Sequence, residues 1–145
     1  MRDDQLHVTL AFLGDVARER IPELHAIACS LGAGAFALRF TQPTYAVRQR
    51  LAWAAPFEVP GDLAELAARL ASSLRNAGFR TEDRRYLPHV TLLRDARRRA
   101  MPEGLVGFEW CVRQFVLVES RLQRTGSAYE VIGAWPLGQL AGAPD

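Results

Sequence analysis

Two histidines, each followed two positions later by a threonine, are the residues of this chain best suited to chemistry. His7 and Thr9 lie near the start, and His89 and Thr91 repeat the pattern 82 positions later (89 − 7). Both copies read His-Val-Thr-Leu, within an apolar run typical of a buried or half-buried strand. Alternate residues of a strand share a face, about 6.6 Å apart at a rise of about 3.3 Å per residue. We therefore expect each strand to present an imidazole and a hydroxyl side by side.

Such a set of side chains suits substitution at phosphorus. That reaction needs the attacking and leaving oxygens roughly in line, so one group must accept a proton while another delivers one on the opposite side. A histidine with its ordinary pKa of about 6.5 can do either. Threonine hydroxyls can hold the non-bridging phosphate oxygens. Two matching strands facing each other across a cleft would supply this chemistry without a metal.

The repeated pattern His-x-Thr-x, with an apolar last residue, resembles the two-histidine phosphoesterase superfamily. Within it the chain is similar to the LigT-like RNA 2′,3′-cyclic phosphodiesterases, also called 2′-5′ RNA ligases. Other stretches that fit this family are Leu-Ala-Phe-Leu-Gly at 10–14, Pro88, Arg94, Leu-Val-Glu-Ser-Arg-Leu at 117–122, Gly126, Tyr129 and Trp-Pro-Leu at 135–137. The resemblance extends over nearly the whole chain.

The resemblance implies an RNA 2′,3′-cyclic phosphodiesterase that forms a 2′-phosphomonoester, with reversible 2′-5′ ligation as an incidental activity. It implies that His7 donates a proton to the departing oxygen and that His89 accepts one from water, although the near symmetry of the motifs leaves the reverse assignment open. Thr9 and Thr91 are implied to bind the phosphate, with Arg94 as a further ligand. Strict alternation turns Arg94 away from His89, so a bulge or strand end must precede it. The implied partners are RNA ends or nucleotides with a 2′,3′-cyclic phosphate, with no cofactor and no metal.

Other functions stay open at this point. The same fold could bind nucleotides or RNA without significant turnover, or act on a small cyclic nucleotide. A metal site built on His7 and His89 lacks an acidic or cysteine partner at ligand spacing. Two purely structural strand histidines are a further alternative, but two identical chance constellations are improbable.

Three other side chains have both a functional and a structural interpretation. Tyr86 precedes the second motif and is a candidate for stacking on a base, with a structural tyrosine as the alternative. Trp53 could also stack on a base, but core packing is the favoured interpretation. His25 lies beside an apolar helical stripe with no threonine two residues on, which favours a surface or boundary histidine.

Composition is that of a soluble globular domain. The chain has 145 residues, of which 49% are hydrophobic and 23% charged, and its net charge of +2 does not argue for nucleic-acid binding. No apolar run reaches the roughly 18 to 20 residues of a membrane span, and no secretory signal precedes the first strand. We therefore expect a cytoplasmic monomer, not associated with a membrane. Cys29 and Cys111 are expected to be buried, reduced thiols.

Periodicity predicts the order β-α-β-β-α-β-β-β, an α+β fold with two largely antiparallel sheets. The expected helices run from Pro22 to Gly32 and from a capping Asp62 to Gly78. After the first motif, strands are expected at 36–40, within 45–53, at the second motif and at 108–112, 114–122 and 129–135, with a loop at 95–107 and a flexible tail at 140–145. The resemblance implies a single LigT-like domain over 1–145, bilobal and pseudo-two-fold symmetric, with helices outside and the active site between the lobes. Proteins of this family usually have a strand and a helix before the first motif, and we expect this chain to lack both.

Overall fold

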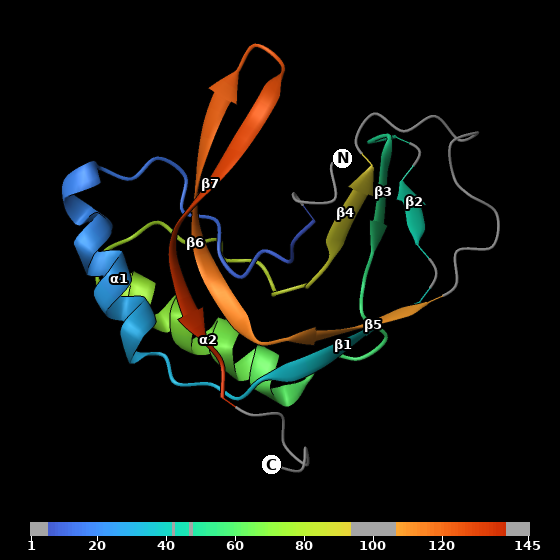
Figure 1. Cartoon of the computed structure of the whole chain (residues 1–145), viewed down its shortest axis with the longest axis horizontal. Coiled ribbons are helices and arrows are strands. Elements are labelled where there is room, and N and C mark those ends of the chain that lie inside the picture. Colours follow the sequence, from blue (N-terminus) through green and yellow to red (C-terminus); the bar gives the residue numbers. More distant parts are fainter. Residues whose placement is uncertain (1–5, 42, 47, 94–106, 139–145) are drawn as a thin grey trace.

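The computed structural model describes residues 6–41, 43–46, 48–93 and 107–138, and Figure 1 shows how they are arranged. In chain order the elements are a 3₁₀ turn (Arg18–Arg20), helix α1 (Ile21–Ser30), strands β1 (Phe36–Phe40), β2 (Thr44–Ala46) and β3 (Leu51–Ala54), helix α2 (Gly61–Asn76), and strands β4 (Val90–Leu93), β5 (Phe108–Val112), β6 (Gln114–Gln123) and β7 (Gly126–Pro136). Every pairing between these named strands is antiparallel. This confirms the predicted α+β class.

The two helices begin and end close to the predicted positions. Helix α1 has Pro22 in its first turn, where a missing amide costs no intrahelical hydrogen bond. The prediction that Asp62 caps α2 was wrong, because Pro60 occupies the N-cap and Asp62 lies in the first turn. There its carboxylate is next to the positive end of the helix dipole. Beyond the C-cap, Gly78 has a φ of +79°, which fits a glycine that ends the helix.

The strands form three sheets within the described residues: β1 with β5, β2–β3–β4, and β6 with β7. The first motif, predicted to be a strand, forms only an isolated antiparallel bridge from Val8 to Val90 of β4. After this short contact the chain turns away at Gly14, which has a φ of +67°. Figure 1 shows this segment running between β4 and the β6–β7 hairpin.

The core lies beneath the motif segments. Leu63 and Leu66 of α2 and Leu38 of β1 are each 1% exposed and belong to its main cluster. Val90 is part of the same cluster, and Val8 packs against it. The apolar residues of the two motifs therefore anchor their segments to the core, which leaves the alternate positions for the histidines and threonines.

The cysteine prediction was wrong about burial, because Cys29 and Cys111 are both exposed and free. The Trp135 indole donates a hydrogen bond from Nε1 to Cys29 Sγ at 3.2 Å, and the ring also contacts His25 edge-on at 5.2 Å. His25 is half-buried, as expected of a boundary residue.

The predicted tail at 140–145 and nearly all of the loop at 95–107 lie outside the described residues. Within the described ranges, no helix combines the length and apolar character needed to cross a membrane.

Candidate active site

The Val8–Val90 bridge sets the register of the two motifs. In an antiparallel pair with Val8 opposite Val90, the flanking positions place His7 opposite Thr91 and Thr9 opposite His89. Val90 is buried and Val8 half-buried toward the core, whereas His7, Thr9 and His89 are exposed. Since side chains alternate across a strand, the four motif side chains share the outer face.

This register places the histidines on one diagonal of the four positions and the threonines on the other. Diagonal neighbours of an antiparallel pair lie roughly 7 to 8 Å apart. A phosphate group fits between imidazoles at such a separation, with each ring on a different side of the phosphorus. The sequence predicted that each histidine shares a face with the threonine two residues on, and it placed the two strands across a cleft. In the structure the two segments are direct neighbours.

His89 is held by the backbone of its own segment. Its Nδ1 lies 2.9 Å from the carbonyl oxygen of Leu87. A carbonyl oxygen can only accept, so Nδ1 carries the proton in this contact. Nε2 is therefore the nitrogen that can exchange a proton with a substrate or water.

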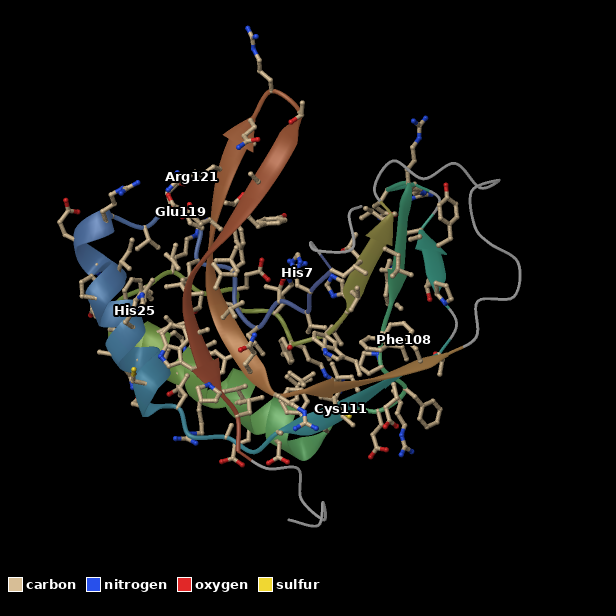
Figure 2. All side chains as sticks on the ribbon, in the orientation of Figure 1. His7, His25, Phe108, Cys111, Glu119 and Arg121 are labelled. Carbon is tan, nitrogen blue, oxygen red and sulfur yellow. The ribbon has the colours of Figure 1, made fainter. Side chains whose placement is uncertain are left out.

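Each motif histidine also contacts one aromatic ring edge-on. The ring centroids of His7 and Tyr129 are 5.6 Å apart with an interplanar angle of 70°. Those of His89 and Trp53 are 6.1 Å apart with an angle of 71°. Figure 2 shows His7 between the β6–β7 hairpin and the β2–β3–β4 sheet.

Trp53 of β3 lies on the face of the site because it follows the pairing of two buried residues, Ala54 with Val90, in the same register. Trp53 is paired with Thr91, but its neighbour Ala52 is paired with Leu93, so Leu92 is the extra residue of a bulge. The shift lies beyond Trp53 as seen from the motif, so the pairing of Trp53 with Thr91 does not depend on it. Nothing in the local sequence indicates the shift, and core packing was the favoured interpretation of Trp53.

Of the two predicted substrate ligands outside the motifs, the structure describes Tyr86 but not Arg94. Arg94 lies outside the described residues, and its role stays a prediction. Tyr86 packs against the main core cluster, and its buried hydroxyl has no hydrogen-bond partner among the described residues. Burial raises the pKa of Tyr86 to about 12. Its position favours the structural alternative over base stacking.

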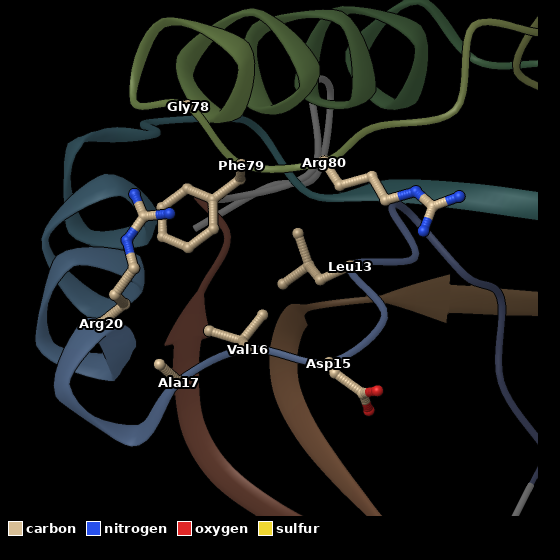
Figure 3. A pocket seen from close by; sticks show the side chains of 8 residues that line it. All are labelled: Leu13, Asp15, Val16, Ala17, Arg20, Gly78, Phe79 and Arg80. Atoms are coloured by element: carbon tan, nitrogen blue, oxygen red, sulfur yellow. The ribbon is translucent and has the colours of Figure 1, made fainter.

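Two cavities lie near the segments that connect the motifs to the helices, and neither is lined by a motif residue. One of about 200 Å³ is formed by eight residues drawn in Figure 3, among them Arg20, Phe79 and Arg80. The Arg20 guanidinium lies 3.7 Å from the centroid of the Phe79 ring and donates a hydrogen bond to the Ala77 carbonyl at 2.7 Å. A second cavity of about 220 Å³ shares Leu13 and Arg80 with the first. The segments that line these cavities connect the two helices to the motif segments.

The side chains gathered at the two histidines are of the kind that exchange protons and bind phosphate oxygens. Within the described ranges, no group of three or more His, Cys, Asp or Glu side chains is arranged to hold a metal ion. The arrangement offers two imidazoles and two hydroxyls on an exposed face, which is the set needed for acid–base chemistry on a phosphodiester.

Known proteins are similar to this chain in sequence and in fold. The chain is 34% identical over 138 residues to the RNA 2′,3′-cyclic phosphodiesterase of Escherichia coli (strain K12), covering 94% of this chain and 78% of that protein. The crystal structure of E. coli LigT in its apo form matches with a TM-score of 0.83 at 33% identity, over 96% of this chain and 80% of that one. E. coli LigT complexed with 3′-AMP matches with a TM-score of 0.80 at 33% identity, over 92% and 78% of the two chains.

A family model described as the 2′-5′ RNA ligase superfamily matches residues 1–121. This match spans most of the chain, and it agrees with the curated relative, the solved structures and the two repeated motifs. The chain therefore belongs to the 2′-5′ RNA ligase superfamily.

Proposed function

We propose that this protein is an RNA 2′,3′-cyclic phosphodiesterase, which opens a terminal 2′,3′-cyclic phosphate to a 2′-phosphomonoester without a metal. The observation that carries the proposal is the register set by the Val8–Val90 bridge, with the histidines on one diagonal of the site and the threonines on the other. The names of the relatives support the same reaction, and one of the solved LigT structures holds a nucleoside monophosphate.

The proposed reaction uses Nε2 of His89 and a ring nitrogen of His7. His89 takes a proton from water at Nε2 while the water oxygen attacks phosphorus. The bond from phosphorus to the 3′ oxygen breaks in line with this attack, and His7 delivers a proton to the departing oxygen. Thr9 and Thr91 donate hydrogen bonds to the non-bridging oxygens, whose charge grows in the transition state.

Arg94 is proposed as a further phosphate ligand. Strict alternation from His89 turns this residue away from the site, so the role needs a shift of one residue before it. The bulge at Leu92 supplies a shift of that size in the pairing of β4 with β3. A guanidinium at this position would add a charge-assisted, bidentate contact to the phosphate.

The test is turnover of 2′,3′-cyclic AMP and of an oligonucleotide ending in a cyclic phosphate, both in EDTA, with chromatographic identification of the product. We expect the 2′-phosphomonoester from both substrates. Formation of the 3′-phosphomonoester would show that the other ester bond is broken. Loss of activity in EDTA with recovery on adding a divalent ion would establish a metal-dependent reaction instead. Tight nucleotide binding without any turnover would favour a binding module with the same fold.

A further inference from the structure

We propose that Tyr129 and Trp53 are positioning residues, each of which holds one catalytic histidine in the orientation needed for in-line proton transfer. This rests on the proposed function of the site. Neither residue is part of a His-x-Thr motif. Their assignment comes from the two edge-on ring contacts, to His7 and His89 respectively.

The two contacts are alike in geometry although they come from unrelated elements. Their centroid separations of 5.6 and 6.1 Å and angles of 70° and 71° fall within the attractive T-shaped range for aromatic pairs. Trp53 lies on β3 and Tyr129 on β7. Figure 1 shows these strands on opposite sides of the first motif segment and β4. Each ring therefore supports one histidine from its own side of the site.

Positioning by a ring has a chemical advantage at this site. His89 already uses Nδ1 for the Leu87 carbonyl, so its Nε2 must stay available for the reaction. An edge-on aromatic contact limits rotation of the imidazole without using either nitrogen. Such a contact raises the fraction of time that the ring spends in the productive orientation.

Core packing does not account for these two rings. Among the described residues, neither Tyr129 nor Trp53 belongs to either hydrophobic core cluster. Tyr129 is 40% exposed, and Trp53 lies on the outer face, where it is paired with Thr91. We therefore expect variants at either position to fold, so that their effect on catalysis can be measured.

The first experiment compares Tyr129→Leu with Tyr129→Phe, and Trp53→Leu with Trp53→Phe, in the cyclic phosphodiesterase assay. We expect each leucine variant to lower kcat by about 2- to 10-fold with little change in KM, because the lost contact orients a reacting group. Each phenylalanine variant keeps a ring and should stay within about 2-fold of the unmodified protein. Phe57→Leu, which removes an exposed aromatic ring from the loop before α2, is the matched control and should have no effect.

The pairing of each ring with one histidine gives a sharper test. The pH profile should be bell-shaped, with one limb for each histidine. If His7 is the acid, Tyr129→Leu should change mainly the high-pH limb and Trp53→Leu mainly the low-pH limb. Tyr129→Leu should add nothing in a His7→Ala background but should keep its full effect in a Trp53→Leu background.

A measurement without substrate separates this proposal from the proposed function. In protein with ¹³C-labelled imidazoles, the NMR order parameter of the His7 ring should fall in Tyr129→Leu and not in Trp53→Leu, with the reverse result for His89. Unchanged ring motion in both variants would overturn the proposal, even if the protein is an active phosphodiesterase. A rise in KM at unchanged kcat would assign the rings to substrate binding and would also overturn it. Absence of turnover in the unmodified protein would remove the proposed function, whereas the ring motions would still decide the positioning role.

Discussion

His7 and His89 offer the same chemistry in nearly the same sequence, but their surroundings differ. The Leu87 carbonyl fixes the proton of His89 on Nδ1, so the neutral ring presents a lone pair at Nε2. A ring held in this form is suited to accept a proton from water, which supports His89 as the base. The sequence motifs could not decide this, because the carbonyl belongs to the backbone of the segment before the second motif.

Replacing either histidine by alanine should lower kcat/KM by about 10²-fold or more, the usual contribution of a general acid or base. The double variant should lose less than the product of the two single losses, since the two groups act on one transition state. Steady-state kinetics with 2′,3′-cyclic AMP would measure this. His25→Ala, at the third histidine, serves as the control and should retain activity. Near-normal turnover in His7→Ala or His89→Ala would contradict the assigned roles.

Tyr86→Phe should leave the protein as stable or more stable by about 1 kcal/mol, because it removes a buried hydroxyl that has no partner among the described residues. Since burial raises the pKa of Tyr86 to about 12 from its ordinary 10.0, the unfolded chain loses this proton first. The associated stability is complete below about pH 10 and is lost as the pH rises through about 12. Denaturant unfolding of both proteins from pH 8 to 12 would test this. An equal decline in the two proteins would rule out Tyr86 as its source.

At the scale of elements, local sequence patterns predicted the helices and strands whose formation depends on local interactions. Alternation of apolar residues predicted β1 and β5, and the helical spacing of leucines predicted α2, because each pattern reflects one buried face. The bulge at Leu92 and the single bridge at Val8 could not be predicted in the same way. Both depend on how a segment pairs with a partner distant in the sequence. The misassigned cap at Asp62 is a smaller error of one or two residues at a helix end.

The pairing of β1 with β5 depends on a close approach at Gly107, just before β5. A Cβ at this position would overlap the backbone carbonyl oxygen of Phe40, which cannot move without displacing β1. Gly107→Ala should therefore lower the free energy of unfolding by about 1 to 3 kcal/mol. Gly32→Ala meets no atom within 4 Å and should change stability by less than about 0.5 kcal/mol. Denaturant unfolding of both variants would compare them, and equal stabilities would show that the β1–β5 edge adjusts freely.

At the scale of the whole molecule, the site draws on segments from both ends of the described chain. The first motif lies near its start, the second motif near its middle, and Tyr129 on the last strand. The sequence predicted both motifs because they repeat one pattern. It did not predict the contribution of β7, since a tyrosine in a strand has no feature that distinguishes a site residue from a structural one.

A product bound at this site should therefore stabilise the entire fold. At a concentration about 100-fold above its Kd, 2′-AMP should raise the midpoint of thermal unfolding by roughly 5 to 10 °C. Adenosine, which lacks the phosphate, should give a much smaller shift, and so should 2′-AMP with the Thr9→Ala/Thr91→Ala variant. Differential scanning fluorimetry would measure these shifts. Equal effects of 2′-AMP and adenosine would show that the phosphate does not bind between the motifs.

The Val8–Val90 bridge also determines when in folding the protein becomes active. It joins residues separated by 82 positions (90 − 8), whereas β6 and β7 are joined by a tight turn and pair with near neighbours in the sequence. Contacts between distant residues must overcome a larger loop-closure entropy, and they slow folding. The β6–β7 hairpin can form early from its own residues, but the four motif side chains meet only when most of the chain has found its place. After dilution from denaturant, turnover should therefore return later than the signal that reports formation of the β6 and β7 strands. The recovery of catalysis would then mark the final folding step.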